Sequence, residues 1–131
     1  MVDGGSNTFD KELAAIVDDR ESIMRRLSQL GALVAHMHEM GVHFKDLKTS
    51  NILIDPDTDG LILIDLDDVR FYQKLTPGVI RDNLQVLFES ISPVVRGLIR
   101  CRVLTVYAAE RGFLRTAYRH LYHSLDFEYQ A

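Results

Sequence analysis

The fold is decided by residues 43–68, which read HFKDLKTSNILIDPDTDGLILIDLDD. Two apolar runs of strand length, at 51–55 and 61–65, flank the turn sequence DPDTDG at 55–60. This pattern predicts a β-hairpin. Residues 42–50 have neither a helical nor a strand period and concentrate charge, which predicts a loop. Because a two-stranded hairpin returns its ends to the same place, we expect residues 51 and 65 to lie close together.

The segments around the hairpin are mainly helical in pattern. Residues 18–40 predict a long amphipathic helix that ends at Gly41, because apolar side chains recur at helical spacing at Ile23, Leu27, Leu30, Val34 and Met37. A short helix is predicted at 10–17, a loop at 67–78, and further helices at 82–90, 93–106 and 110–124. The fold class predicted from this order is α+β and mostly helical, with a small sheet.

Four polar residues in the central stretch suit phosphoryl transfer, which needs an oriented acceptor, a held metal ion and neutralised charge. Asp46 can accept the proton of a hydroxyl group, and Lys48 can neutralise the transferring phosphoryl group. Asn51 at the entrance of the hairpin and Asp65 at its exit offer two oxygen ligands for Mg²⁺. We expect these residues to form a single acidic pocket.

Composition narrows the class of protein. The 131 residues suffice for one domain, and 47% hydrophobic with 26% charged residues is ordinary for a globular protein. A net charge of −4 and a pI near 5.7 argue against a nucleic-acid partner. A single cysteine indicates a reducing compartment. With no leader pattern and no apolar run of membrane length, we expect a cytoplasmic protein.

The segment DLKTSN at 46–51 resembles the catalytic loop of protein-kinase-like enzymes, H-R-D-L-x-x-x-N, with Phe44 and Lys45 in the places of its His and Arg. Asp65 falls where the D-F-G motif is expected. The resemblance implies that Asp46 is the catalytic base, that Asn51 and Asp65 bind Mg²⁺, and that Lys48 contacts the γ-phosphate of ATP. Phe44 is expected to act as a packing residue.

Weaker motifs make the chain similar to the bacterial lipopolysaccharide kinase (Kdo/WaaP) family. They are IDLDDVR at 64–70, RDNL at 81–84 and FLRTAY at 113–118. The resemblance implies an ATP-dependent phosphotransferase acting on a sugar hydroxyl of lipopolysaccharide, or on a similar saccharide, lipid-linked saccharide or small molecule. The short segment between 65 and 82 leaves little room for a peptide-docking platform. The aminoglycoside and choline phosphotransferase type shares the Asp/Asn/Asp set but has larger helical insertions.

The kinase pattern is incomplete at its N-terminal side. Residues 1–17 are expected to be a flexible or short helical lead, and 18–131 a kinase-like C-terminal lobe without a complete N-terminal lobe. No glycine-rich loop or strand lysine precedes the long helix. We therefore expect weak ATP binding unless the missing lobe comes from the same gene or from a partner chain. The alternative is a non-catalytic, pseudokinase-like fragment or binding module.

The C-terminal third is rich in arginine, at Arg96, Arg100, Arg102, Arg111, Arg115 and Arg119. One interpretation is contact with a saccharide phosphate or peripheral contact with an anionic membrane lipid. The other, which the nearby acidic residues favour, is a solvated helix face.

Overall fold

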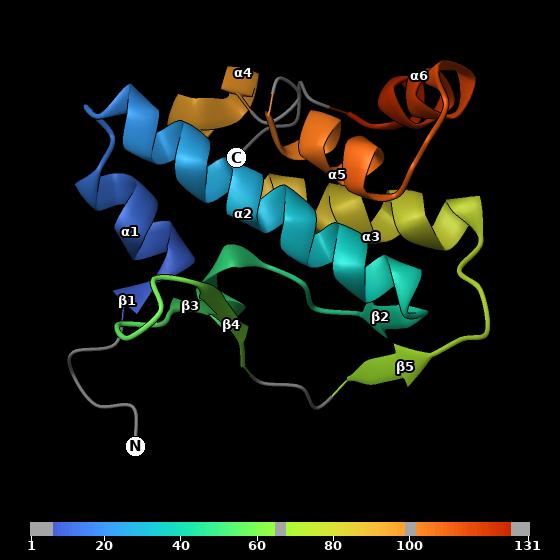
Figure 1. The fold of residues 1–131 in the computed structure, drawn as a ribbon, viewed down its shortest axis with the longest axis horizontal. Coiled ribbons are helices and arrows are strands. Elements are labelled where there is room, and N and C mark those ends of the chain that lie inside the picture. Colours follow the sequence, from blue (N-terminus) through green and yellow to red (C-terminus); the bar gives the residue numbers. More distant parts are fainter. Residues whose placement is uncertain (1–6, 65–67, 99–101, 127–131) are drawn as a thin grey trace.

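The computed structural model describes residues 7–64, 68–98 and 102–126. Its elements are, in chain order, β1 (Asn7–Thr8), α1 (Phe9–Ala15), α2 (Arg20–Glu39), β2 (Val42–Phe44), the 3-10 turn η1 (Thr49–Asn51), β3 (Ile52–Ile54), β4 (Leu61–Leu63), β5 (Val69–Phe71), α3 (Pro77–Glu89), the 3-10 turn η2 (Pro93–Val95), α4 (Arg96–Leu98), α5 (Leu104–Glu110) and α6 (Arg115–Ser124). Helix α2 crosses the molecule, with the strands on one side of it and α5 and α6 on the other (Figure 1). The predicted mixed, mainly helical class is confirmed.

Helix α2 confirms the predicted long helix. It begins after Asp19, whose carboxylate caps it by accepting a hydrogen bond from the backbone N–H of Ser22. Its apolar stripe is buried, and Gly31 lets α5 approach closely, since a Cβ there would lie 2.6 Å from the carbonyl oxygen of Val103. The chain turns away at Gly41, where φ is +76°, a conformation that favours glycine.

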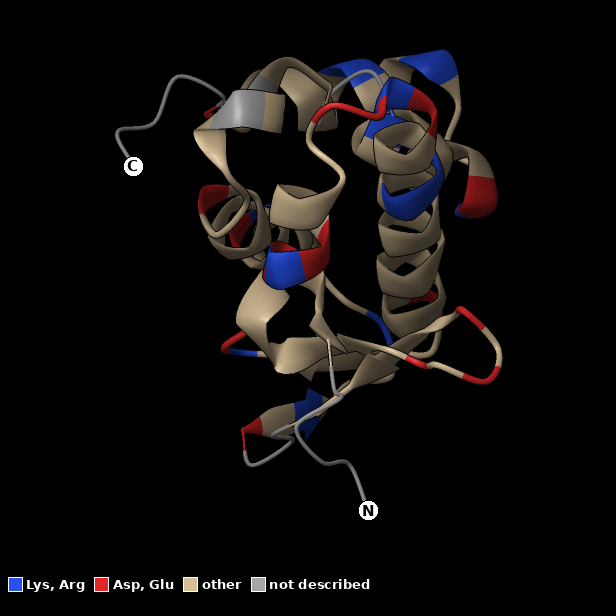
Figure 2. Ribbon diagram, turned by 90° about the vertical axis from the view of Figure 1, so that its left-hand side faces the viewer, with Lys and Arg blue, Asp and Glu red and all other residues tan. Residues whose placement is uncertain are grey.

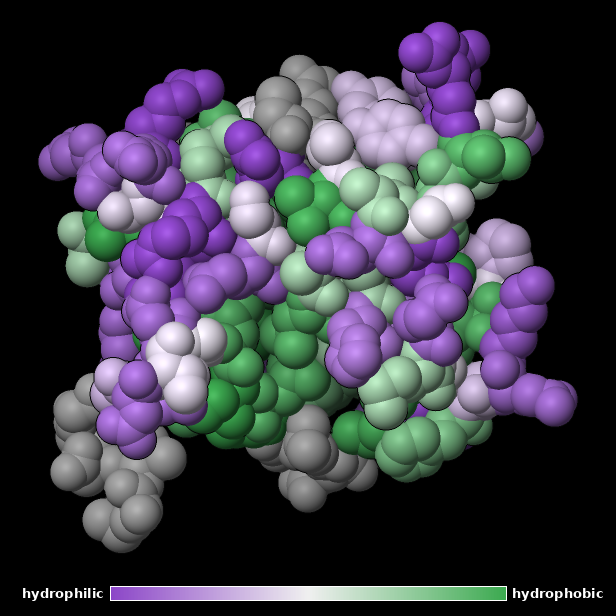
Figure 3. Space-filling view, in the orientation of Figure 1, coloured by the Kyte–Doolittle hydropathy of each residue, from purple (hydrophilic) through white to green (hydrophobic). Residues whose placement is uncertain are grey.

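The predicted hairpin is confirmed as β3 and β4, which pair antiparallel with Leu53 opposite Ile62. Strand β1 adds to the other edge of β3, giving a three-stranded sheet in the order β1-β3-β4. Strand β3 is buried along its length, whereas β4 is half-buried and Ile62 is exposed. Apolar side chains gather in a hollow below α2, toward the strands (Figure 3).

A second sheet was missed by the sequence analysis. Residues 42–44 and 69–71, both assigned to loops, form β2 and β5, which pair antiparallel with Val42 opposite Phe71. Strands of three residues are too short to show a period, and the paired residues are 25 to 29 positions apart in the chain, so local patterns do not reveal the pairing. The left-handed Gly41 helps to join them, because its carbonyl accepts a hydrogen bond of 2.8 Å from the N–H of Tyr72.

The later helices differ from prediction in their limits. Helix α3 begins at Pro77 rather than 82, because the Thr76 hydroxyl caps it by accepting from the N–H of Val79. The helix predicted at 93–106 corresponds to η2, α4 and the start of α5, with residues 99–101 outside the described residues, and the helix predicted at 110–124 begins only at Arg115, as α6. Helix α5 ends at Glu110, and Gly112 at φ +69° separates it from α6.

The hairpin turn is tied to α2 by a buried cation. The guanidinium of Arg26 donates to the Glu12 carboxylate at 2.8 Å, to the Gln29 side chain at 3.0 Å, and to the carbonyl and carboxylate of Asp59 at 2.9 and 2.7 Å. Arg25, half-exposed, also pairs with Asp59. Figure 2 shows acidic residues gathered on the turn between β3 and β4, and basic residues on α2.

One apolar core joins the helices and the sheets. Phe9 and Leu13 of α1 are buried together with the apolar faces of α2, α3 and α5, so the segment before residue 18 packs into the same core. Within the described ranges, none of the helices combines the length and the apolar character that crossing a membrane requires.

Candidate active site

The charged loop between β2 and β3 is fixed by its alternate residues. Leu47 is fully buried in the core, and Thr49 is buried against the C-terminal end of α3. The N–H of Thr49 donates to the Ser90 hydroxyl at 3.0 Å, and its own hydroxyl donates to the Ser90 carbonyl at 3.1 Å. Because Leu47 and Thr49 point inward, Asp46 and Lys48 face solvent.

Asp46 and Lys48 lie side by side on this loop. The Lys48 ammonium nitrogen is 3.7 Å from a carboxylate oxygen of Asp46, and the two side chains are 46% and 66% exposed. An ion pair this exposed contributes little to folding stability, so its position is not explained by a structural need. A proton acceptor and a cation that can bind phosphate are thus presented together at the surface.

Asn51 folds back onto the same loop. Its side-chain N–H donates to the backbone carbonyl of Asp46 at 3.1 Å, which identifies the nitrogen of the amide and turns its oxygen the other way. That oxygen has no hydrogen-bond donor among the described residues and is the atom a hard cation would take. The amide therefore fits a magnesium ligand.

The remaining predicted ligand, Asp65, lies outside the described residues. Its neighbour Ile64 donates its N–H to the carbonyl of Asn51 at 2.9 Å, so the chain passes Asn51 directly before residue 65. The structure thus brings Asp46, Lys48 and Asn51 together, and it places the residue before Asp65 at Asn51. The grouping of all four remains a prediction.

The residues before Asp46 hold the loop from the strand side. Phe44 is fully buried, which confirms its predicted packing role. Burial lowers the pKa of His43, and its Nδ1 has no hydrogen-bond partner among the described residues. Lys45 contacts Asp68 twice, with its backbone N–H on the carbonyl at 3.2 Å and its ammonium 3.7 Å from the carboxylate.

The sequence analysis missed three supporting residues, which are Asn83 on α3, Ser90 at the C-terminal cap of α3, and His38 on α2. The side-chain amide of Asn83 donates to the backbone carbonyl of Phe44 at 2.8 Å, and its oxygen lies 2.8 Å from Nε2 of His38. A signal existed, because Asn83 and His38 are polar residues at otherwise apolar helix positions. That signal does not identify the hydrogen-bond partner, because Phe44, the partner of Asn83, lies 39 residues away in the chain.

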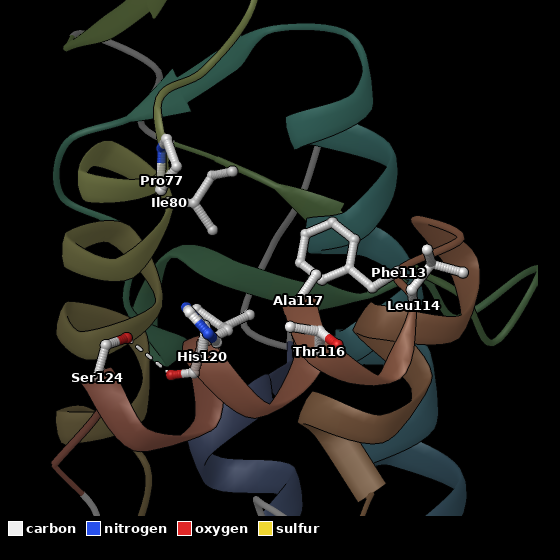
Figure 4. A pocket seen from close by; sticks show the side chains of 9 residues that line it. Pro77, Ile80, Phe113, Leu114, Thr116, Ala117, His120 and Ser124 are labelled. Carbon is white, nitrogen blue, oxygen red and sulfur yellow. Dashed lines mark hydrogen bonds between the residues drawn. The ribbon is translucent and has the colours of Figure 1, made fainter.

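An apolar hollow lies elsewhere, between α3 and α6. It has a volume of about 680 Å³ and is lined mainly by apolar side chains, namely Pro77, Ile80, Phe113, Leu114, Thr116, Ala117, His120, Leu121 and Ser124. In Figure 4, Ile80 faces the hollow from α3, and Phe113 and Ala117 face it from the α6 side. Asp46, Lys48 and Asn51 do not line it.

The arginine-rich region is not gathered on one surface. Arg115 and Arg119 are exposed on α6, whereas Arg111 lies over the rings of Tyr107 and Phe113 with its guanidinium carbon 5.8 and 5.4 Å from their centres. Arg100 and the side chain of Arg96 lie outside the described part of the chain. Among the arginine side chains of this region that the structure describes, Arg115 and Arg119 are the exposed ones.

The chain resembles known proteins both in its sequence pattern and in its fold. The model of the lipopolysaccharide kinase (Kdo/WaaP) family matches residues 10–95. The fold is similar to the solved structure of WaaP in complex with acyl carrier protein, with a TM-score of 0.54 and 16% sequence identity. That similarity covers 94% of this chain but 59% of the WaaP chain. No curated protein sequence matches the chain.

Proposed function

Because the chain belongs to the lipopolysaccharide kinase (Kdo/WaaP) family, we propose that it carries the catalytic loop of an ATP-dependent phosphotransferase. The acceptor in this proposal is a sugar hydroxyl of lipopolysaccharide or of a similar saccharide. The observation that carries the proposal is the pairing of Asp46 with Lys48 on a loop fixed from behind by Leu47 and Thr49.

Asp46 and Lys48 divide the work of the transfer. The Asp46 carboxylate orients the acceptor hydroxyl and accepts its proton as the oxygen attacks the γ-phosphate. The Lys48 ammonium, 3.7 Å from that carboxylate, neutralises charge on the transferring phosphoryl group. In the absence of substrate the same ammonium compensates the charge of Asp46.

Asn51 and Asp65 are the proposed ligands of Mg²⁺. The Asn51 oxygen is left without a hydrogen-bond donor among the described residues, and oxygen ligands of this kind suit a hard cation that keeps its remaining sites for water and phosphate. When bound, the ion would neutralise charge on the phosphates of ATP. The hydrogen bond from Asn51 to the Asp46 carbonyl sets the spacing between ligand and base.

A pair of matched substitutions tests this function in the full-length protein. Asp46→Asn preserves size and removes the proton acceptor, so kcat for phosphate transfer should fall by about 10²- to 10⁴-fold. Asp57→Asn makes the same chemical change on an exposed residue of the hairpin turn and should leave kcat unchanged. Transfer of ³²P from ATP to purified lipopolysaccharide, with a saccharide fragment in parallel, gives the rate.

The result has two informative failures. An Asp46→Asn protein with the rate of the wild type would reject Asp46 as the base. A wild-type protein that binds a partner but transfers no phosphate to any saccharide, with full ATP binding, would instead favour the non-catalytic binding module.

The hollow between α3 and α6 is the proposed surface for the apolar part of a lipid-linked acceptor. Its apolar lining supports this, and Ile80 lies one turn before Asn83, which bonds the catalytic loop. Ala117→Trp should fill the hollow and raise KM for the lipid-linked acceptor while KM for ATP stays constant. Val86→Trp, on an exposed position of α3 outside the hollow, is the control. Equal acceptor KM values in the two variants would remove the hollow from the acceptor site.

A further inference from the structure

A buried histidine connects the helices to the catalytic loop. His38, in the last turn of α2, is 2% exposed, and both of its ring nitrogens have a polar partner. Nδ1 lies 2.6 Å from the hydroxyl of Tyr107 on α5, and Nε2 lies 2.8 Å from the side-chain oxygen of Asn83 on α3. Burial keeps the ring neutral at physiological pH, so one nitrogen donates and the other accepts.

The direction of these hydrogen bonds follows from their two ends. The nitrogen of the Asn83 amide donates to the Phe44 carbonyl at 2.8 Å, so the amide oxygen faces His38 and can only accept. Nε2 of His38 therefore carries the proton, and Nδ1 accepts the hydroxyl proton of Tyr107. The oxygen of Tyr107 in turn accepts a hydrogen bond of 2.9 Å from Arg111.

The result is a hydrogen-bond chain with one direction, running from Arg111 through Tyr107, His38 and Asn83 to the Phe44 carbonyl. It ends two residues before Asp46. We propose that His38 is a positioning residue, which through its single tautomer fixes the Asn83 amide as a donor to the Phe44 carbonyl and so sets the orientation of Asp46. This inference rests on the proposed function for its effect on rate, but not for its effect on structure.

The physical reason lies in what the amide would do without the histidine. An asparagine side chain can rotate so that its oxygen and nitrogen exchange places, at the expense of its hydrogen bonds. With Nε2–H of His38 in place, the exchanged orientation would set two donors against each other and two oxygens against each other at Phe44. The oxygen–oxygen contact at Phe44 disfavours the exchanged orientation by itself, and the histidine adds the contact between two donors, which an apolar side chain of similar volume would remove.

Four substitutions test the chain. His38→Leu removes both hydrogen bonds, whereas His38→Gln restores a donor toward Asn83 and an acceptor toward Tyr107. We expect kcat to fall about 10- to 100-fold in His38→Leu, with KM for ATP unchanged, and to recover in His38→Gln. Asn83→Asp keeps the acceptor for His38 but cannot donate to Phe44, so it should behave like His38→Leu. Gln85→Ala is the control, because Gln85 is also a buried amide on α3 but bonds Asp126 and not the loop.

A second readout needs no catalysis. Long-range ¹H–¹⁵N spectra of the wild type should show His38 protonated at Nε2, and the backbone amide signals of residues 45–48 should shift in Asn83→Asp but not in Gln85→Ala. Protonation at Nδ1, or unmoved loop signals in Asn83→Asp, would overturn the inference even if the protein proved inactive. If the protein is active, an unchanged kcat in His38→Leu would overturn the inference. If the wild type transfers no phosphate, only the proposed function is rejected.

Discussion

Replacing Arg26 with methionine should destabilise the protein far more than the same change at its neighbour Arg25. Both arginines contact the carboxylate of Asp59 in the hairpin turn. The Arg26 side chain is 4% exposed and also bonds Glu12, Gln29 and the Asp59 carbonyl, whereas the Arg25 side chain is 50% exposed and bonds Asp59 alone among the described residues. The pair of variants therefore compares a buried with an exposed cation on one shared anion.

The expected loss of stability depends on which charged groups each substitution leaves without a partner. Breaking a fully buried ion pair costs about 3–5 kcal/mol, because the remaining charge stays buried without its partner. Here the Glu12 side chain is 15% exposed and keeps a hydrogen bond from Asn7 at 2.9 Å, while Asp59 reaches water, so we expect about 2–4 kcal/mol for Arg26→Met. Arg25→Met should change the free energy of unfolding little, since exposed ion pairs contribute little.

Urea unfolding followed by circular dichroism measures the difference, read from the midpoint at unchanged slope. Hydrogen bonds from Arg26, and then from Arg25, hold the pKa of Asp59 below its usual value. This interaction stabilises the fold above the unfolded pKa of about 4 and is lost as the pH falls through the folded pKa. The difference in the free energy of unfolding between Arg26→Met and the wild type should therefore become smaller at acidic pH. Equal midpoints for the two arginine variants at pH 7 would refute the reasoning.

Three further outcomes are expected. Burial lowers the pKa of His38 from 6.5 to about 4, so between these pH values the unfolded chain binds a proton that the folded protein does not. The free energy of unfolding should therefore fall by roughly 3 kcal/mol as the pH drops from 6.5 to 4. His38→Gln should flatten this part of the curve of stability against pH. Gly41→Ala should lower the free energy of unfolding, measured by thermal unfolding, by about 2 kcal/mol or more, because φ is +76° and the new Cβ would lie 2.0 Å from a carbonyl oxygen. Gly78→Ala is the control and should not lower it, because the new Cβ would meet open space. In an active full-length protein, Asn51→Ala should raise the Mg²⁺ concentration needed for half-maximal phosphate transfer, and an unchanged requirement would remove Asn51 from the proposed ligands.

The sequence predicted those parts of the molecule whose signal is local. The apolar stripe of α2, the hairpin at 51–65 and the spacing of Asp46, Lys48 and Asn51 are each defined by residues close together in the chain. Each can therefore be recognised without knowledge of the fold. The sheet of β2 and β5 and the contacts of the loop with α3 join residues far apart in the chain. A three-residue strand or a single buried asparagine gives no indication of its partner, because the partner is chosen by tertiary packing.

Helix α3 shows how such a hidden partner can determine a site. Asn83 and Ser90 are seven residues apart, so they lie two turns apart on the same face of the helix, separated by about 10 Å. They bind the loop at Phe44 and at Thr49, five residues that would span about 17 Å if extended. The loop between these two anchors must therefore bend away from the helix, with Leu47 turned into the core. Asp46 lies within that bend, so the rigid spacing of two polar residues on α3 fixes where the proposed base meets its substrate.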